Sequence, residues 1–143
     1  MATEDLIVKA INILSDEMRL CMRKHKEQAA DGKELFNLSI TQLHYLHAIK
    51  ERIAPTITEL AEIFGVQKST VTVAVNKLLQ RGFLEKNASQ SDLRVVHVSL
   101  AEKGKRLIEI EDQGYYQFAG QVIQSLTEAE KTQFVKLLHK ITQ

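Results

Sequence analysis

Residues 67–81 carry the side chains whose types and spacing best fit a specific chemistry. In a helix, one arc of this segment has the i, i+3, i+4, i+7 spacing of a buried face: Val71, Ala74, Val75 and Leu78. The opposite arc has no acidic residue and carries hydroxyls, amides and one apolar group: Ser69, Thr72, Val73, Asn76 and Gln80, with Lys77 at its edge. Hydroxyls and amides bond the edges of bases, and a valine fits against a thymine methyl group. The segment therefore predicts a helix that reads DNA bases; a merely solvated helix face is the alternative.

Cations flank this segment and suit the phosphate backbone of a nucleic acid. Lys68 lies at the helix start, where backbone N–H groups also favour an anion. Lys77 and Arg81 lie toward the far end, so we expect them to anchor phosphates rather than to read bases.

A polar stretch at residues 87–92 is typical of a hairpin loop and supplies a second candidate contact. Asp92 and Arg94 are two residues apart and are expected on one strand face, so the carboxylate holds the guanidinium in a fixed direction for a narrow minor groove. The alternative is a surface ion pair worth less than about 1 kcal/mol. The remaining polar groups of the loop fit either phosphates or any solvated turn: Ser89, Gln90 and Ser91.

The elements that position these groups are mostly helical, because the 143 residues include one proline and six glycines. Apolar spacing predicts a first helix that ends in the polar stretch 28–34, with Gly32 as its stop. Capping residues and glycines predict three more helices, over about 39–54, 56–64 and 67–81. In the third helix we expect an inward-facing set: Leu60, Ala61 and Ile63. The turn after it is about three residues long, as in a helix-turn-helix.

After Gly82 the apolar period changes from helical to alternating. Residues 83–86 and 95–100 predict two short strands around the polar loop. Two helices follow, for which Ser99 with Glu102 and Thr127 with Glu130 have capping-box spacing. The predicted fold class is mainly α with a small β-hairpin wing. It comprises a winged helix-turn-helix domain over 38–103 and helical dimerisation regions over 1–37 and 104–143.

The first and last helices carry apolar stripes with little left in their own chain to cover them. The first repeats apolar groups every three or four residues: Ile7, Ile11, Leu14, Met18 and Cys21. The last has a matching face: Phe134, Leu137, Leu138 and Ile141. A second copy of the chain is the simplest cover, so we expect a homodimer with two-fold symmetry.

Composition is that of an ordinary globular protein, with 44% hydrophobic and 26% charged residues. We expect no membrane span and no secretory signal, because no apolar run approaches 18 residues and the N-terminus is acidic. The single cysteine allows no intrachain disulfide and favours the cytoplasm. The net charge is only +1, yet residues 65–98 hold five cations and two acids, a local excess of three that a polyanion would feel.

Several stretches together resemble the MarR family of bacterial transcription regulators. They are Leu38-Ser-Ile-Thr-Gln-Leu, Thr58-Glu-Leu-Ala, Gly65-Val-Gln-Lys-Ser-Thr-Val-Thr, Leu79-Gln-Arg-Gly-Phe-Leu-Glu-Lys, Ser91-Asp-Leu-Arg and Val98-Ser-Leu-Ala-Glu-Lys-Gly. The resemblance implies a dimer on a pseudo-palindromic DNA operator, with helix 67–81 in the major groove and the wing in the minor groove. It also implies repression that is relieved by a small, often aromatic or phenolic, effector.

The residues that we expect to contact DNA are Lys68, Ser69, Thr70, Thr72, Val73, Asn76, Lys77, Arg81, Ser89, Gln90, Asp92 and Arg94. The sequence departs from the family at three positions. Leu93 replaces a second wing arginine, Gln67 stands where a serine cap is common, and Ala101 replaces a frequent threonine. The first of these removes one cation from the groove contact.

Other chemistries have weaker support. Cys21 would suit a redox switch but lies on the apolar stripe of the first helix, where packing is the simpler role. His44, His47 and Glu51 share a helix face that would present a metal with three ligands; packing or a polar pocket wall is the alternative. The sequence holds no glycine-rich phosphate loop, HExxH or G-x-S-x-G motif, so we expect neither an enzyme nor a cofactor.

A ligand-responsive DNA-binding regulator is therefore the leading functional hypothesis. The runner-up is a winged-helix module that binds a protein partner and has little affinity for DNA. The near-neutral charge and Leu93 both fit this second hypothesis.

Overall fold

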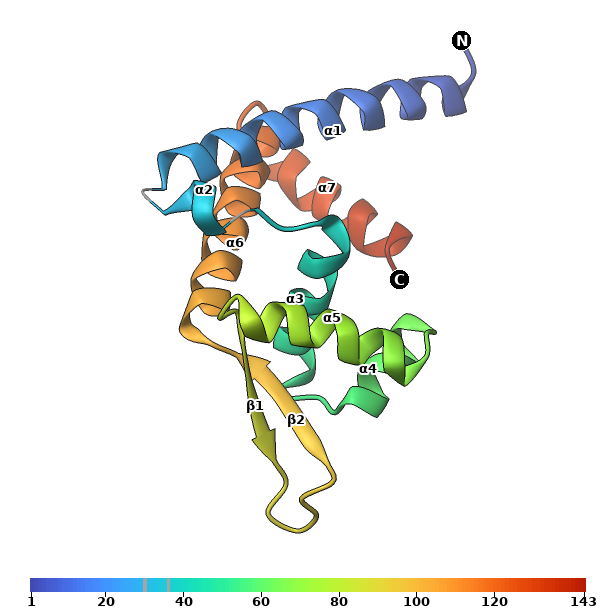
Figure 1. Cartoon of the computed structure of the whole chain (residues 1–143). Helices are drawn as coiled ribbons and strands as arrows, with labels where there is room; N and C mark the ends of the chain where they lie inside the picture. The colour runs from blue at the N-terminus through green and yellow to red at the C-terminus, as the bar shows by residue number, and fades with distance from the viewer. Residues whose placement is uncertain (30, 36) are drawn as a thin grey trace. The chain divides into compact units, whose positions relative to one another are not determined.

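The computed structural model describes residues 1–29, 31–35 and 37–143, with the backbone alone at residue 34, and is mainly helical with one antiparallel hairpin (Figure 1). In chain order the elements are α1 Thr3–Gln28, α2 Gly32–Leu35, α3 Ile40–Arg52, α4 Ile57–Phe64, α5 Lys68–Gln80, β1 Leu84–Ala88, β2 Val96–Leu100, α6 Glu102–Ile123 and α7 Glu128–Ile141. This confirms the predicted fold class. Among the described residues, none of the helices combines the length and the apolar character that a membrane span requires.

The chain divides into two compact units. One comprises residues 26–111 and holds α2 to β2 with the first part of α6; the other comprises residues 1–25 and 112–143. The assignment of the terminal helices to dimerisation remains a prediction.

The core of unit 26–111 draws on every long element within it. Its fully buried side chains are Leu46 and Ile49 from α3, Leu60 from α4, Val71, Val75 and Leu78 from α5, Phe83 and Val98 from the hairpin, and Leu107 and Ile110 from α6. Each such side chain contributes about 1.5–3 kcal/mol by leaving water. Because three of them come from one face of α5, this helix has one fixed rotation about its axis.

Local capping explains where the helices of this unit begin and end. Ser39 and Gln42 make a reciprocal capping box at the start of α3, and the Thr56 side chain accepts the Glu59 backbone N–H at the start of α4. Gly65 ends α4 with a φ of 62°, a left-handed conformation that glycine adopts without strain. These boundaries agree with the predicted ones.

The wing is a short hairpin that extends away from the helices of its unit (Figure 1). The register pairs Leu84 with Leu100 and Ala88 with Val96, and β1 begins one residue later and ends two residues later than predicted. The segment before α4 pairs along the other edge of β2: the Val98 N–H donates to the Pro55 carbonyl at 2.9 Å, beside an antiparallel bridge from Thr56. This second edge contact fixes the hairpin to the helical core.

Three local predictions are wrong. Gly32 does not end the first helix but opens α2; it allows a close approach, since a Cβ there would lie 2.0 Å from the Lys26 carbonyl oxygen. Part of the predicted stop region, residue 30, lies outside the described residues. Ile63 is exposed, because the face of α4 that meets the core is formed by Leu60 and Ala61, with Ile57 and Phe64 packed beside them. Ser99 lies within β2, so it does not cap α6.

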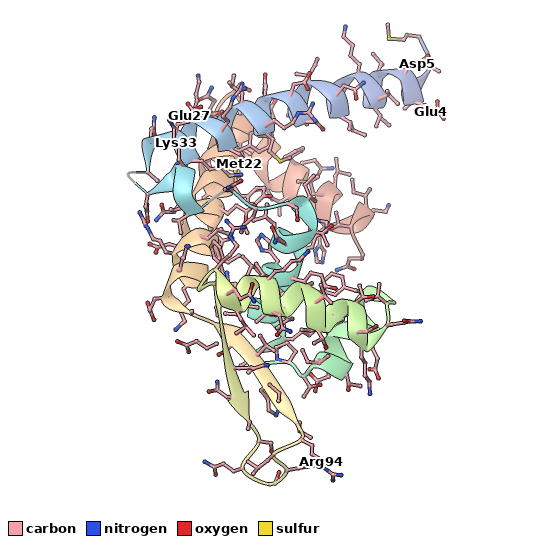
Figure 2. The ribbon with its side chains drawn as sticks, in the orientation of Figure 1. Glu4, Asp5, Met22, Glu27, Lys33 and Arg94 are labelled. Carbon is pink, nitrogen blue, oxygen red and sulfur yellow. The ribbon has the colours of Figure 1, made fainter. Side chains whose placement is uncertain are left out.

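In unit 1–25 with 112–143, helix α1 packs closely on α6 at Gly114. A Cβ at this glycine would lie 2.6 Å from the Met22 sulfur, so a larger residue there would require the end of the Met22 side chain to move. Cys21 is buried at the same place, with its Sγ 3.9 Å from the Gly114 carbonyl oxygen. Figure 2 labels the neighbouring Met22. The Thr127–Glu130 capping box at the start of α7 is confirmed.

Ile53, at the end of α3, predicts a stabilising substitution. Its φ of 52° is left-handed, which is strained for a β-branched residue, and its side chain is 85% exposed. We expect Ile53→Asn to raise the free energy of unfolding by about 1 kcal/mol, because asparagine tolerates this conformation and little burial is lost. Urea denaturation measures the change, with Ile40→Asn as the control at an exposed isoleucine of ordinary φ. A free energy of unfolding that falls with Ile53→Asn would contradict the strain.

Candidate nucleic-acid interface

The outer face of α5 is exposed along its whole length and carries the predicted polar set. The residues on it are Ser69, Thr70, Thr72, Val73, Asn76, Lys77 and Gln80. The opposite face is buried in the core through Val71, Val75 and Leu78. The structure therefore gathers these predicted residues on one surface of one rigid element.

The first turn of α5 has features that suit an anion. Gln67 occupies the N-cap position without a side-chain cap hydrogen bond, and no acidic residue lies in the first turn. The helix N-terminus thus keeps backbone N–H groups for an outside acceptor, next to the exposed Lys68. The Thr72 hydroxyl donates to the Lys68 carbonyl oxygen at 2.9 Å. The hydroxyl oxygen of Thr72 remains able to accept a hydrogen bond, and the donated bond fixes the orientation of the hydroxyl group.

Arg81 has a structural role at the other end of α5 that the sequence did not reveal. Its guanidinium carbon lies 5.3 Å from the centre of the buried Phe83 ring, and the Lys103 ammonium lies 4.6 Å from the same centre. Lys103 also donates to the Arg81 carbonyl oxygen at 3.0 Å. A cation is favourable at this position, because the C-terminal end of a helix carries partial negative charge. Arg81 is half-buried, so its predicted phosphate contact depends on the part of the guanidinium that remains exposed.

The hairpin loop brings together four of the predicted residues, and Figure 2 shows Arg94 at its far end. The Asp92 carboxylate accepts the Arg94 backbone N–H at 3.0 Å and its side-chain Nε at 3.1 Å, with a longer contact from Nη2 at 3.4 Å. Ser89 and Ser91 join through their hydroxyls at 2.9 Å. Gln90 between them is exposed. These contacts give the tip of the loop a defined shape.

One detail of this pair differs from the prediction. Asp92 and Arg94 lie in the turn before β2, not on a face of the strand, because β2 begins only at Val96. The carboxylate nevertheless holds the guanidinium, whose side chain is 91% exposed. The hydrogen bond from the Arg94 side chain, followed by that from its backbone, lowers the pKa of Asp92 below its ordinary value.

Two positioning residues, Lys103 and His97, were missing from the predicted set. His97 shares a 2.8 Å hydrogen bond through Nδ1 with the Ala54 carbonyl oxygen and so ties β2 to the segment before α4. No local pattern would have found either residue, because their partners lie 22 and 43 positions away in the sequence.

Two of the residues considered for other chemistries, His47 and Cys21, take part in pairing and packing. His47 Nε2 lies 2.6 Å from Oε2 of the buried Glu111, 64 positions away. Among the described residues, no group of three or more His, Cys, Asp or Glu side chains is arranged to hold a metal ion. Cys21 is buried on α1.

The sequence matches the profile of the MarR family over residues 38–96. Two curated relatives from Bacillus subtilis (strain 168) extend this match across most of the chain. The uncharacterised HTH-type transcriptional regulator YwhA is 30% identical over 122 residues, which cover 84% of each chain. The HTH-type transcriptional repressor MdtR is 23% identical over 143 residues, which cover all of this chain and 90% of MdtR.

Solved structures share the fold. The crystal structure of Streptococcus pneumoniae FabT in complex with DNA has a TM-score of 0.67 at 24% identity and covers 97% of this chain and 91% of its own. The structure of S. aureus MepR bound to ethidium bromide has a TM-score of 0.73 at 19% identity and covers 99% of this chain and 95% of its own.

The helix-turn-helix with its β-hairpin, the profile match from α3 to the start of β2, and relatives that span most of both chains agree with one another. They also confirm that the relatives are regulators rather than enzymes. The chain belongs to the MarR family of transcriptional regulators.

Proposed function

We propose that this regulator is a repressor that binds a pseudo-palindromic DNA operator as a homodimer and releases it when a small aromatic or phenolic molecule binds. Helix α5 enters the major groove, and the wing reaches the adjacent minor groove. The observation that carries the proposal is the outer face of α5, where exposed hydroxyl, amide and cationic groups occur without an acid on a helix whose other face buries Val71, Val75 and Leu78.

Each group on this face has a chemical role in the proposal. In this proposal the exposed Asn76 bonds adenine, the exposed Val73 packs on a thymine methyl group, and Lys68 meets a phosphate together with the helix N-terminus. The wing supports the same function, because a guanidinium held by a carboxylate enters a narrow groove with less loss of side-chain freedom.

Exposed apolar groups on the terminal helices support the homodimer. On α1 they include Leu6, Ile7, Val8, Ile11, Ile13 and Leu14, and on α7 they include Val135, Leu137, Leu138 and Ile141. A monomer would leave this surface in water, whereas a two-fold partner would cover it. A dimer also places two copies of α5 on one DNA duplex, as a pseudo-palindromic operator requires.

The named relatives support the regulatory part of the proposal. MdtR is called a repressor, FabT was crystallised with DNA, and MepR was crystallised with ethidium bromide, a planar aromatic cation. The exposed Tyr116 on α6 offers an aromatic surface of the kind that such a ligand would stack on.

The competing function is a winged-helix module for a protein partner. Salt separates the two, because DNA binding loses affinity in proportion to the number of phosphates that are neutralised. Binding of a duplex that ignores ionic strength, or no binding at low ionic strength, favours the protein partner.

Substitutions on α5 and on the wing have different expected effects. Asn76→Ala changes which sequences are preferred, because it removes base contacts worth about 1–3 kcal/mol. Arg94→Ala lowers affinity for all sequences and reduces the slope of log K against log salt by about 0.9. Gel shifts on the DNA upstream of the chain's own gene, at several salt concentrations, measure both effects. Equal binding by the wild type and both variants would show that Asn76 and Arg94 do not have the proposed roles.

The wing pair predicts a direction of change in the titration of Asp92. In the wild type the lowered pKa keeps the pair intact at neutral pH, and the pair is lost only as the pH falls through that lowered pKa. Arg94→Ala removes the larger of the two lowering causes, so the pKa of Asp92 rises toward its ordinary value of 3.8. Carboxyl NMR titration checks this, with Arg81→Ala as the control; an unchanged pKa in Arg94→Ala would show that the pair does not form in solution.

The dimer proposal predicts a different response at two exposed isoleucines. Ile11 on α1 is 54% exposed and Ile40 on α3 is 73% exposed. Ile11→Glu should weaken self-association at least tenfold, since it places a charge in the dimer interface, whereas Ile40→Glu should leave it unchanged. Sedimentation equilibrium measures both; a wild type that is monomeric at micromolar concentration contradicts the proposal.

A further inference from the structure

We propose that Leu93, at the tip of the wing, is a DNA-contacting residue that packs on the wall of the minor groove. The wing then binds through one cation and one apolar group, instead of through two cations. This inference rests on the proposed function and adds a specificity-determining residue to it.

The backbone of the loop presents Leu93 outward. The Val95 N–H donates to the Asp92 carbonyl oxygen at 3.0 Å, which closes a four-residue turn with Leu93 and Arg94 at its two central positions. The Ser89 N–H donates to the Val95 carbonyl oxygen at 2.8 Å and closes the loop below the turn. Leu93 is 78% exposed at this tip.

The neighbouring Asp92–Arg94 ion pair determines which part of the DNA Leu93 contacts. Asp92 accepts hydrogen bonds from both the backbone and the guanidinium of Arg94, so the arginine and the turn move together while this pair is formed. Consecutive Cα atoms are about 3.8 Å apart. A turn that delivers Arg94 to a groove therefore delivers Leu93 to the same groove.

The surroundings distinguish this leucine from an ordinary exposed apolar residue. A single exposed leucine needs no explanation by itself. Between Lys86 and Arg94, however, Leu93 is the one large apolar side chain, and the others are polar or alanine. Since Arg94 is the one cation between Asn87 and Val95, an apolar neighbour adds contact area without adding a second cation.

The chemistry of the minor groove suits such a contact and predicts a base preference. Its walls are sugar rings, which offer apolar surface, and other proteins insert leucine there. At an A·T pair the floor carries only acceptors, whereas a G·C pair adds the guanine amino group, which narrows the space. Leu93 thus favours A·T pairs beneath the wing, and inosine·cytosine pairs, which lack that amino group, should behave like A·T pairs.

The test uses a duplex that the full-length wild type selects from a random-sequence pool. We expect Leu93→Ala and the polar Leu93→Asn to lower affinity five- to tenfold with an unchanged salt slope, and Leu93→Met to stay within twofold of the wild type. Ile40→Ala, at an exposed apolar residue outside the wing, is the matched control and should bind as the wild type does. Thermal unfolding verifies that every variant is folded.

The same duplex is then made with G·C or inosine·cytosine pairs at the positions that the wing protects from hydroxyl radicals. The wild type should lose affinity with G·C and regain it with inosine·cytosine, and Leu93→Ala should lose this discrimination. Wild-type affinity in Leu93→Ala and Leu93→Asn, or a loss that comes with a changed salt slope, overturns the inference alone. A wild type that selects no duplex overturns the proposed function itself.

Discussion

The interface depends on the burial of one face of α5. Val71, Val75 and Leu78 are almost completely removed from water among leucines of the neighbouring helices, and this fixes the rotation of the helix about its own axis. A helix rotated by one residue would turn about 100° and bring a polar group into the core, at a cost of several kcal/mol. The direction in which Asn76 and Val73 point is therefore a consequence of core packing. Their own chemistry matters only after the core has placed them.

The wing is positioned by strand pairing as well as by burial. Its strands are short, and a two-stranded hairpin has little stability by itself. It gains support because β2 also pairs with the segment before α4, through the Pro55 carbonyl and the His97 side chain. The tip is then shaped by local bonds between Asp92 and Arg94, which need no core. Helix α5 and the wing thus share one scaffold; α5 is held by apolar burial, and the wing is held by its buried Leu84 and Val98 together with these hydrogen bonds.

The terminal helices α1 and α7 differ from the winged unit in how much apolar surface they expose. Much of the apolar side-chain area of α1 and α7 is exposed, whereas the apolar groups of the winged unit are mostly in its core. Where α1 meets α6, Met22 packs closely against Gly114. In the proposed dimer, this exposed apolar surface of α1 and α7 would be covered by the partner copy, while unit 26–111 holds its own core.

The sequence by itself determined the helices, the hairpin and the outer face of α5, because these follow from apolar periods, capping residues and contacts within a few positions. The family resemblance added the role of the wing, and the Asp92–Arg94 pair was predictable because its partners are two positions apart. Only the tertiary structure decided the contacts of Lys103 with Arg81, His97 with Ala54 and Glu111 with His47, since these partners are 22, 43 and 64 positions apart. It also decided that Gly32 opens a helix and that Ile63 faces water, because both depend on what the folded chain places beside them. Spacing along a chain records local geometry, whereas burial and distant pairing arise only when the whole core has formed.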